Sequence, residues 1–164
     1  MLLPDVVNGL NDIDPLLVDP AGGDFHLLYD SPCIDAGYSW KRGFLPSTYP
    51  SGISTIDFEG DHRIVDGDGD GVSTVDIGVD EFIPNLPDLQ AFLQALADRG
   101  ELDEATAARL LAYVDDAQAA LDQDWKKTAI RDLNQLIDDV EASLGDTETA
   151  QLIVMKTEAV IDIL

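Results

Sequence analysis

Basic residues are scarce in this sequence. Its 164 residues include 9 lysines and arginines against 33 aspartates and glutamates, and the formal net charge is −24. The first 83 residues and the remainder both carry this excess, so the acids do not form a tail. A surface of this kind repels phosphate, which excludes nucleic acid and anionic lipid as partners. It suits divalent cations, basic partners or high salt, and it also serves simply to keep a protein soluble.

Cysteine and long apolar runs are lacking too. Cys33 is the single cysteine, so no internal disulfide can form, and an isolated thiol of this kind is typical of a small buried side chain. No run of about 18 apolar residues occurs, which excludes insertion into a membrane. The first ten residues, MLLPDVVNGL, have no basic segment and no long apolar run, so they do not form a signal peptide.

Catalytic motifs are likewise missing. The sequence has no G-x-S-x-G or H-E-x-x-H motif, and the glycines of its DGDGDG stretch alternate with aspartates that repel phosphate. His26 and His62 have no second ligand at metal-binding spacing. Acids are so numerous that their pairing carries no information about acid–base chemistry on a sugar. Such chemistry could in principle use Asp57, Glu59, Asp76 and Asp80, but many other acids of the sequence would serve equally. We expect no catalytic residues and no enzyme activity from this chain.

The spacing of apolar residues divides the chain into two halves. Residues 13–83 combine glycine- and proline-rich turns with apolar runs of strand length, which predicts short strands joined by loops. After Pro87 glycine nearly disappears, and apolar residues recur at the three- and four-residue spacing of amphipathic helices. We therefore predict an α+β protein of two domains. A short-strand segment spans 1–83, a linker 84–87, and a small antiparallel bundle of three to four helices 88–164.

The second half has recognisable helix starts and stops. Gly100 and Gly145 are expected to end helices. Asp103 is expected to cap one helix, and Asp146 or Thr147 is expected to cap the last. The apolar stripes predict the buried positions, which are Leu89, Phe92, Leu93, Leu96, Leu110, Leu111, Val114, Ala117, Leu121, Ala129, Leu133, Leu136, Ile137, Val140, Leu144, Leu152, Ile153, Val160, Ile161 and Leu164. Because these faces can close on one another, we expect the helical half to fold alone.

One acidic stretch, residues 64–81, reads IVDGDGDGVSTVDIGVDE. Asp66, Asp68 and Asp70 occupy alternate positions before a glycine, which matches the first six positions of a calcium-binding loop. The match weakens at position 12, where a bidentate acid belongs and Ile77 stands. The strand-like flanks also exclude the helix–loop–helix of an EF-hand.

The acidic stretch nevertheless predicts a calcium site of a shorter kind. Three carboxylates at this spacing repel one another, and a hard cation relieves that repulsion. The predicted metal ligands are Asp66, Asp68, Asp70, the carbonyl of Val72, and Asp76, with Asp80 as an alternative closing ligand. The other interpretation, which the sequence leaves open, is a solvated acidic turn that binds no ion.

Aromatic residues gather in an irregular stretch at 38–55. They are Tyr38, Trp40, Phe44 and Tyr49, and Lys41 and Arg42 stand among them. Because aromatic faces stack on sugar rings, a polysaccharide or another cell-surface component is a candidate partner. Packing within the loop is the other interpretation.

Two longer phrases carry a resemblance to a known family. They are DIDPLLVDPAGGDFHLLYDSPCIDAG at 12–37 and IDFEGDHRIVDGDGDGVSTVDIGVDEF at 56–82. In content and order they resemble the C-terminal end of the choice-of-anchor Q proteins, surface proteins built on a right-handed parallel β-helix. The second half, with LLAYVDDAQAAL at 110–121, resembles the FIMAH domain, a small helical module of secreted bacterial proteins.

The resemblance implies that the short-strand segment closes a β-helix whose earlier coils precede this chain, because a coil normally buries its inner face against stacked neighbours. We therefore expect a non-catalytic C-terminal portion of a longer secreted or cell-surface precursor, with a structural or adhesive role and a calcium-stiffened loop. One alternative is the non-catalytic end of a polysaccharide lyase or glycoside hydrolase of β-helix fold. Another is a halophilic protein whose acids respond to salt alone.

Overall fold

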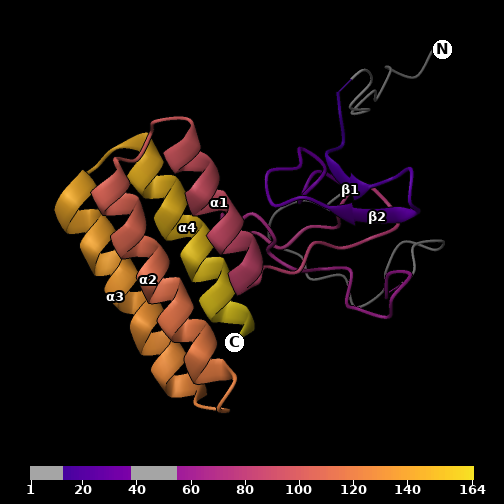
Figure 1. Cartoon of the computed structure of the whole chain (residues 1–164). Helices are drawn as coiled ribbons and strands as arrows, with labels where there is room; N and C mark the ends of the chain where they lie inside the picture. Colours follow the sequence, from indigo (N-terminus) through magenta and orange to yellow (C-terminus); the bar gives the residue numbers. More distant parts are fainter. Residues whose placement is uncertain (1–12, 38–54) are drawn as a thin grey trace, which may run out of the picture.

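The computed structural model describes residues 13–37 and 55–164 (Figure 1). Four helices form the C-terminal half, and they are α1 (Leu86–Asp98), α2 (Glu104–Leu121), α3 (Lys126–Leu144) and α4 (Glu148–Ile163). We call residues 85–164 the helical domain and the described residues before them the N-terminal half. In that half β1 (Leu17–Asp19) and β2 (Asp24–Leu27) form an antiparallel hairpin. The predicted small helical bundle is therefore confirmed.

Strand pairing in the N-terminal half differs from the parallel β-helix that the resemblance implies. β1 and β2 are antiparallel, and the described residues hold no parallel pair. Beyond this hairpin, the described part of the predicted short-strand segment contributes isolated bridges between Ile56 and His62 and between Val65 and Thr74. The physical reason is that many backbone N–H groups here bind carboxylate side chains instead of a neighbouring strand.

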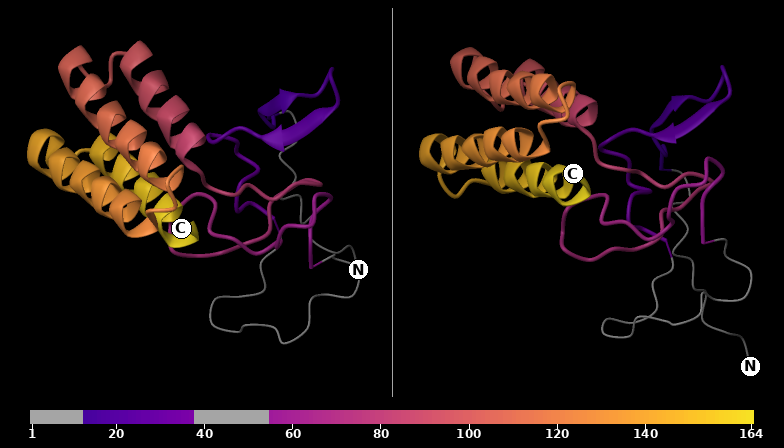
Figure 2. Two further views of the ribbon diagram at one scale, coloured as in Figure 1. Left: turned by 60° about the horizontal axis from the view of Figure 1, so that its bottom comes forward. Right: turned by 90° about the horizontal axis from the view of Figure 1, so that it is seen from below.

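The four helices run up-down-up-down around one core (Figures 1 and 2). Each helix packs on the next one in the chain, and α4 returns to pack on α1. Fully buried side chains from all four helices fill the centre, and they include Leu93, Leu96, Leu110, Leu133, Leu136, Val140 and Ile153. Leu111, Leu144 and Leu152, also predicted as core, are half-buried at its edge because they lie at the margins of their apolar stripes.

Polar side chains set the starts of three helices. Asp103 Oδ1 accepts the N–H groups of Ala105 and Thr106, both at 3.0 Å, and so begins α2 as predicted. Of the two predicted caps for α4, Thr147 is the one that acts, because its Oγ1 accepts the N–H of Ala150 at 3.1 Å. Such caps satisfy backbone donors that have no partner inside the helix.

Helix α1 begins two residues before the predicted start of the helical bundle at residue 88. Leu86 and Pro87, assigned above to the linker at 84–87, form its first turn. Asn85 Oδ1 accepts the N–H of Asp88 at 3.0 Å and caps the helix. Proline fits this turn because the first helical N–H groups need no partner within the helix.

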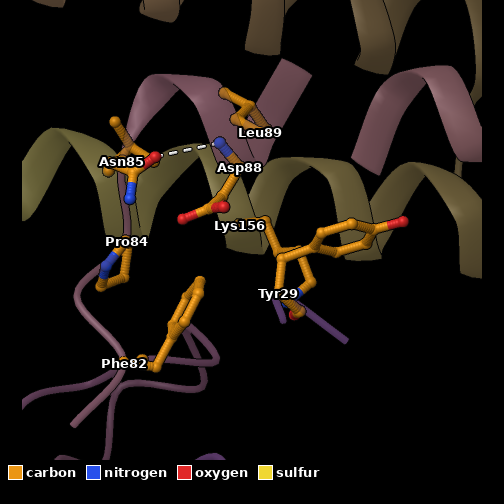
Figure 3. A pocket seen from close by; sticks show the side chains of 9 residues that line it. Tyr29, Phe82, Pro84, Asn85, Asp88, Leu89 and Lys156 are labelled. Carbon is orange, nitrogen blue, oxygen red and sulfur yellow. Dashed lines mark hydrogen bonds between the residues drawn. The ribbon is translucent and has the colours of Figure 1, made fainter. Parts of the chain in front are cut away.

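The two halves meet at Tyr29, which follows β2. Its ring packs edge-on against Phe92 of α1, with ring centroids 5.6 Å apart. Its carbonyl oxygen accepts a hydrogen bond from Lys156 Nζ of α4 at 2.8 Å. A crevice between the halves is lined by Tyr29, Phe82, Pro84, Asn85, Asp88, Leu89 and Lys156 (Figure 3). With a volume of about 10 Å³ it holds roughly one water molecule and no larger ligand.

A fragment of residues 85–164 is predicted to fold and melt cooperatively, because its core is made of helical side chains and it retains the Asn85 cap. Asn85→Ala should lower the stability of this fragment by about 1 kcal/mol. Circular dichroism with thermal melting measures both. Asn134→Ala, in the exposed interior of α3, is the matched control and should not destabilise the fragment, since alanine favours helix. A disordered spectrum for the fragment at neutral pH would contradict its independence.

Candidate functional site

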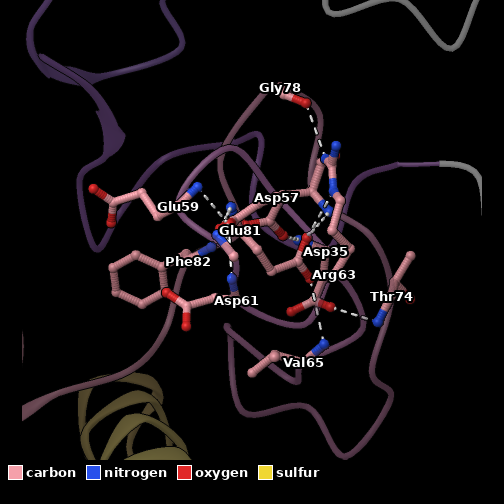
Figure 4. Close-up of polar contacts among 12 residues, drawn as sticks. Asp35, Asp57, Glu59, Asp61, Arg63, Val65, Thr74, Gly78, Glu81 and Phe82 are labelled. Carbon is pink, nitrogen blue, oxygen red and sulfur yellow. Dashed lines mark hydrogen bonds and ion pairs between the residues drawn. The ribbon is translucent and has the colours of Figure 1, made fainter. Parts of the chain in front are cut away.

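Carboxylate side chains organise the loops of the N-terminal half (Figure 4). Asp57 is the most heavily used example. Its Oδ1 accepts the N–H groups of Glu59, Gly60 and Asp61 at 2.8–2.9 Å, and its Oδ2 accepts that of Glu81 at 3.3 Å. Burial acts to raise the pKa of Asp57, but these four donors outweigh it and hold the pKa below its ordinary value. One side chain therefore shapes a turn and fastens a distant segment to it.

Asp35 and Asp76 join the two sequence blocks that carry the family resemblance. Asp76 Oδ1 accepts the N–H of Asp35 at 2.7 Å, and its Oδ2 accepts that of Phe82 at 2.6 Å. Asp35 in turn accepts the N–H groups of Gly67, Asp68 and Thr74 at 2.8–3.0 Å. The bonds that involve Asp35 each span more than thirty residues of chain and hold the CIDAG and VDIG segments side by side.

A network around Glu81 lies deeper in the N-terminal half. Its side chain is buried, and its two oxygens accept the N–H groups of Val65 at 3.3 Å and Asp76 at 3.1 Å. Arg63 Nε lies 3.7 Å from Glu81 Oε2, too far for a hydrogen bond, and this nitrogen is buried with no hydrogen-bond partner. Burial therefore dominates over the nearby arginine and raises the pKa of Glu81 to about 8.

The acidic loop, residues 66–72, is held by its own carboxylates. Asp66 accepts the N–H of Gly69 at 2.8 Å through Oδ1 and that of Gly71 at 2.7 Å through Oδ2. Asp68 Oδ1 accepts the N–H of Asp70, and Asp70 Oδ1 accepts that of Val72. The loop is thus a series of tight turns closed by aspartates.

Three carboxylates converge at this loop, and they belong to Asp35, Asp66 and Asp68. Each offers an oxygen within 4.8 Å of the others, and this carboxylate cluster is the one group of potential metal ligands among the described residues. Two oxygens bound to one calcium ion at 2.3–2.6 Å lie at most about 5 Å apart, so the spacing fits a shared ion. Asp68 has a raised pKa, chiefly through burial and further through the charges of Asp70 and Asp66.

The structure brings together only part of the predicted ligand set. Asp66 and Asp68 are in the cluster, whereas Asp70 and Val72 point their polar groups at neighbouring loop atoms. Asp76 is engaged on both oxygens by Asp35 and Phe82. Asp35, which sequence reasoning did not select, takes the third place in the cluster. Its signal in the sequence is weak, because it lies about thirty residues from the loop.

His26 has a structural partner on each ring nitrogen. Nδ1 lies 2.5 Å from Asp24 Oδ1, and Nε2 lies 3.1 Å from Glu59 Oε2. The hydrogen bond with Asp24, followed by that with Glu59, raises the pKa of His26 to about 9. The imidazolium is therefore charged at neutral pH and ties β2 to the turn of residues 57–61.

The acids considered for catalysis on a sugar are all engaged in the fold. Asp57 and Asp76 bind backbone donors as described, and Asp80 Oδ2 accepts the N–H of Leu27 at 3.3 Å. Glu59 pairs with His26. The aromatic residues Tyr38, Trp40, Phe44 and Tyr49 lie outside the described residues.

The protein thus consists of a small helical domain and an N-terminal half that has little β-sheet. Carboxylate side chains close the loops of the N-terminal half. Residues 86–162, slightly less than half of the chain, match the model of the FIMAH domain. The FIMAH family is non-catalytic and is associated with cell-surface proteins. No curated protein and no solved structure matches the chain. None of the helices in the described part is long and apolar enough to span a membrane.

Stability in the absence of divalent cations is predicted to fall as pH rises from about 4 to 8. Burial, the largest cause in each case, raises the pKa of Asp35 and of Asp76 to about 6 and that of Glu81 to about 8. The folded chain keeps these protons to higher pH than the unfolded chain, so the free energy of unfolding decreases across this window.

Urea unfolding of the full chain at a series of pH values measures this effect. Glu81→Gln, which imitates the protonated acid, should flatten the upper part of the profile between about pH 6 and 8. Glu158→Gln, on the exposed face of α4, should leave the profile unchanged. A stability that rises with pH over this window would show that these carboxylates are ionised in the fold at little free-energy cost.

Proposed function

We propose that this chain is a non-catalytic, calcium-stabilised module of a secreted or cell-surface protein. In this proposal the helical domain follows the closing segment of a right-handed parallel β-helix, and the role of the module is structural or adhesive. The observation that carries the proposal is the FIMAH match over residues 86–162, since that family is non-catalytic and associated with the cell surface. The structural engagement of Asp57, Asp76 and Asp80 supports a role without catalysis.

Exposed apolar side chains of the N-terminal half support a place at the end of a β-helix. Val18 on β1 and Phe25 on β2 are 49% and 46% exposed, and Phe58 and Val79 are 56% and 57% exposed. Exposed apolar side chains of this size favour packing against another layer of β-strands, because that packing removes the side chains from water. A preceding coil of the same polypeptide is the proposed layer.

Calcium is the proposed ion because the carboxylate cluster offers only hard oxygen ligands. A carboxylate has about four lone-pair sites, so the cluster has about twelve. Backbone N–H groups use three of these on Asp35, two on Asp66 and one on Asp68. Acceptor capacity therefore remains for a cation, with water completing its shell. Three carboxylates without a bidentate acid make a weak site, with Kd on the order of 0.1–1 mM.

Millimolar calcium is predicted to raise the melting temperature of the full chain, by binding the folded state alone. Magnesium at equal concentration should do much less, because it requires a stricter octahedron and retains its water. Asp68→Ala should abolish the calcium response, and without calcium it should be neutral or slightly stabilising, since it removes one of three repelling charges. Asp116→Ala, which removes one exposed acid of α2, is the control for net charge and should keep the response.

Differential scanning calorimetry with each ion makes the comparison. Equal shifts from calcium and magnesium would reduce the effect to screening of charge, as would an intact response in the Asp68 variant. The cluster would then be an acidic turn that binds no specific ion.

The cell-surface assignment is tested separately. An antibody raised against residues 85–164 is predicted to label intact producing cells, because the module is proposed to lie outside the membrane. Immunofluorescence before and after permeabilisation measures this, and an antibody against a cytoplasmic protein of the same cells is the control. Labelling confined to permeabilised cells would contradict the assignment.

A further inference from the structure

The acidic loop lies directly against helix α4. A loop of the N-terminal half reaches this helix in both views of Figure 2. At Gly69 the two backbones are so close that an added Cβ atom would overlap the carbonyl oxygen of Met155 and lie 2.9 Å from its carbonyl carbon. Gly69 also has a φ of +84°, which favours glycine. The loop that carries Asp66 and Asp68 is thus in contact with the helical domain through its own main chain.

Lys156, the next residue of α4, makes a second connection between the halves. Its Nζ donates to the carbonyl of Tyr29 at 2.8 Å and lies 5.6 Å from the centroid of the Phe92 ring. The negative charge of Asp68 acts on this ammonium group from the loop. Lys156 therefore links the turn after β2, helix α1 and the acidic loop at one point.

We propose that the acidic loop couples cation binding in the N-terminal half to the stability of the helical domain. This inference rests on the proposed calcium site. Gly69 directly follows Asp68, and its N–H donates to Asp66 Oδ1, so an ion shared by these two carboxylates fixes the turn that touches Met155. An ion that favours the ordered loop must also favour the docked arrangement, because the two share the same backbone atoms. The helices are stabilised although they hold no ligand of the ion.

Two glycines of the loop provide a matched pair of variants. Gly69 and Gly71 have φ values of +84° and +83°, and each donates its N–H to Asp66. An alanine at either position therefore introduces the same backbone strain in the same turn. Only Gly69 faces α4, because a Cβ atom at Gly71 has nothing within 4 Å. A difference between Gly69→Ala and Gly71→Ala isolates the contact with the helix.

The variant Lys156→Met distinguishes binding of the ion from the effect of that binding on the stability of the helical domain. The substitution keeps most of the aliphatic stem but removes the bond to Tyr29 and a positive charge that opposes a nearby cation. Calcium affinity should rise roughly twofold to threefold, because a like charge near the ion is gone. The stabilisation that reaches the helices should nevertheless fall. A residue that merely supports the fold would lower both.

The experiment uses the full chain and measures two quantities for the wild type and the three variants. Isothermal titration gives calcium affinity, and melting followed in the helical circular dichroism band gives the stability of the helices. Saturating calcium should raise the wild-type helical melting temperature by about 5 °C. Gly71→Ala should keep this rise at saturation, and Gly69→Ala and Lys156→Met should lose at least half of it.

The possible outcomes are distinct. If calcium binds and the helical transition of the wild type does not move, the coupling is wrong and the calcium site stands. If calcium does not bind, the proposed site fails, and the calcium-free melts decide whether the loop supports the helices. In that case Gly69→Ala must lower the helical melting temperature more than Gly71→Ala does, and equal melting temperatures overturn the contact as a coupling element.

Discussion

The hydrogen bond from a backbone N–H to a carboxylate oxygen is the interaction on which the N-terminal half depends. Buried backbone donors need partners, and a sheet normally supplies them. Here the described sheet is a two-stranded hairpin, and side chains such as Asp35, Asp57 and Asp76 supply acceptors in its place. Hydrogen bonds to a charged acceptor are shorter and about twice as strong as neutral ones. These hydrogen bonds can therefore stabilise a single conformation in a segment that has little regular secondary structure.

Acidic side chains therefore have different roles in the two halves of the chain. In the helical domain most acids are exposed, as at Asp115 and Glu141, and their role is to keep the surface solvated. In the N-terminal half several acids, among them Asp35, Asp76 and Glu81, are partly or fully buried where they bind backbone donors. Three carboxylates approach one another there, at Asp35, Asp66 and Asp68. The repulsion among these three carboxylates is the physical reason for proposing a cation in this half.

The helical domain could be predicted closely from the sequence, because its determinants are local. The spacing of Leu89, Leu93 and Leu96 and the caps at Asp103 and Thr147 act within one or two turns. The third carboxylate of the cluster could not be predicted, because Asp35 reaches the loop through hydrogen bonds across more than thirty residues. The calcium-loop pattern selected Asp66 and Asp68 but also residues that the fold uses elsewhere. A sequence motif identifies candidate carboxylate ligands, but the fold determines which of these carboxylates lie close together.

The four donors gathered by Asp57 have a consequence for local motion. The amide protons of Glu59, Gly60, Asp61 and Glu81 share one acceptor group, so they are released together when that carboxylate withdraws. In hydrogen exchange these residues form a single opening unit even though three lie in a turn and one lies twenty residues further on. Protection against exchange in this half therefore follows the positions of its aspartates, and a map of helices and strands does not reveal it.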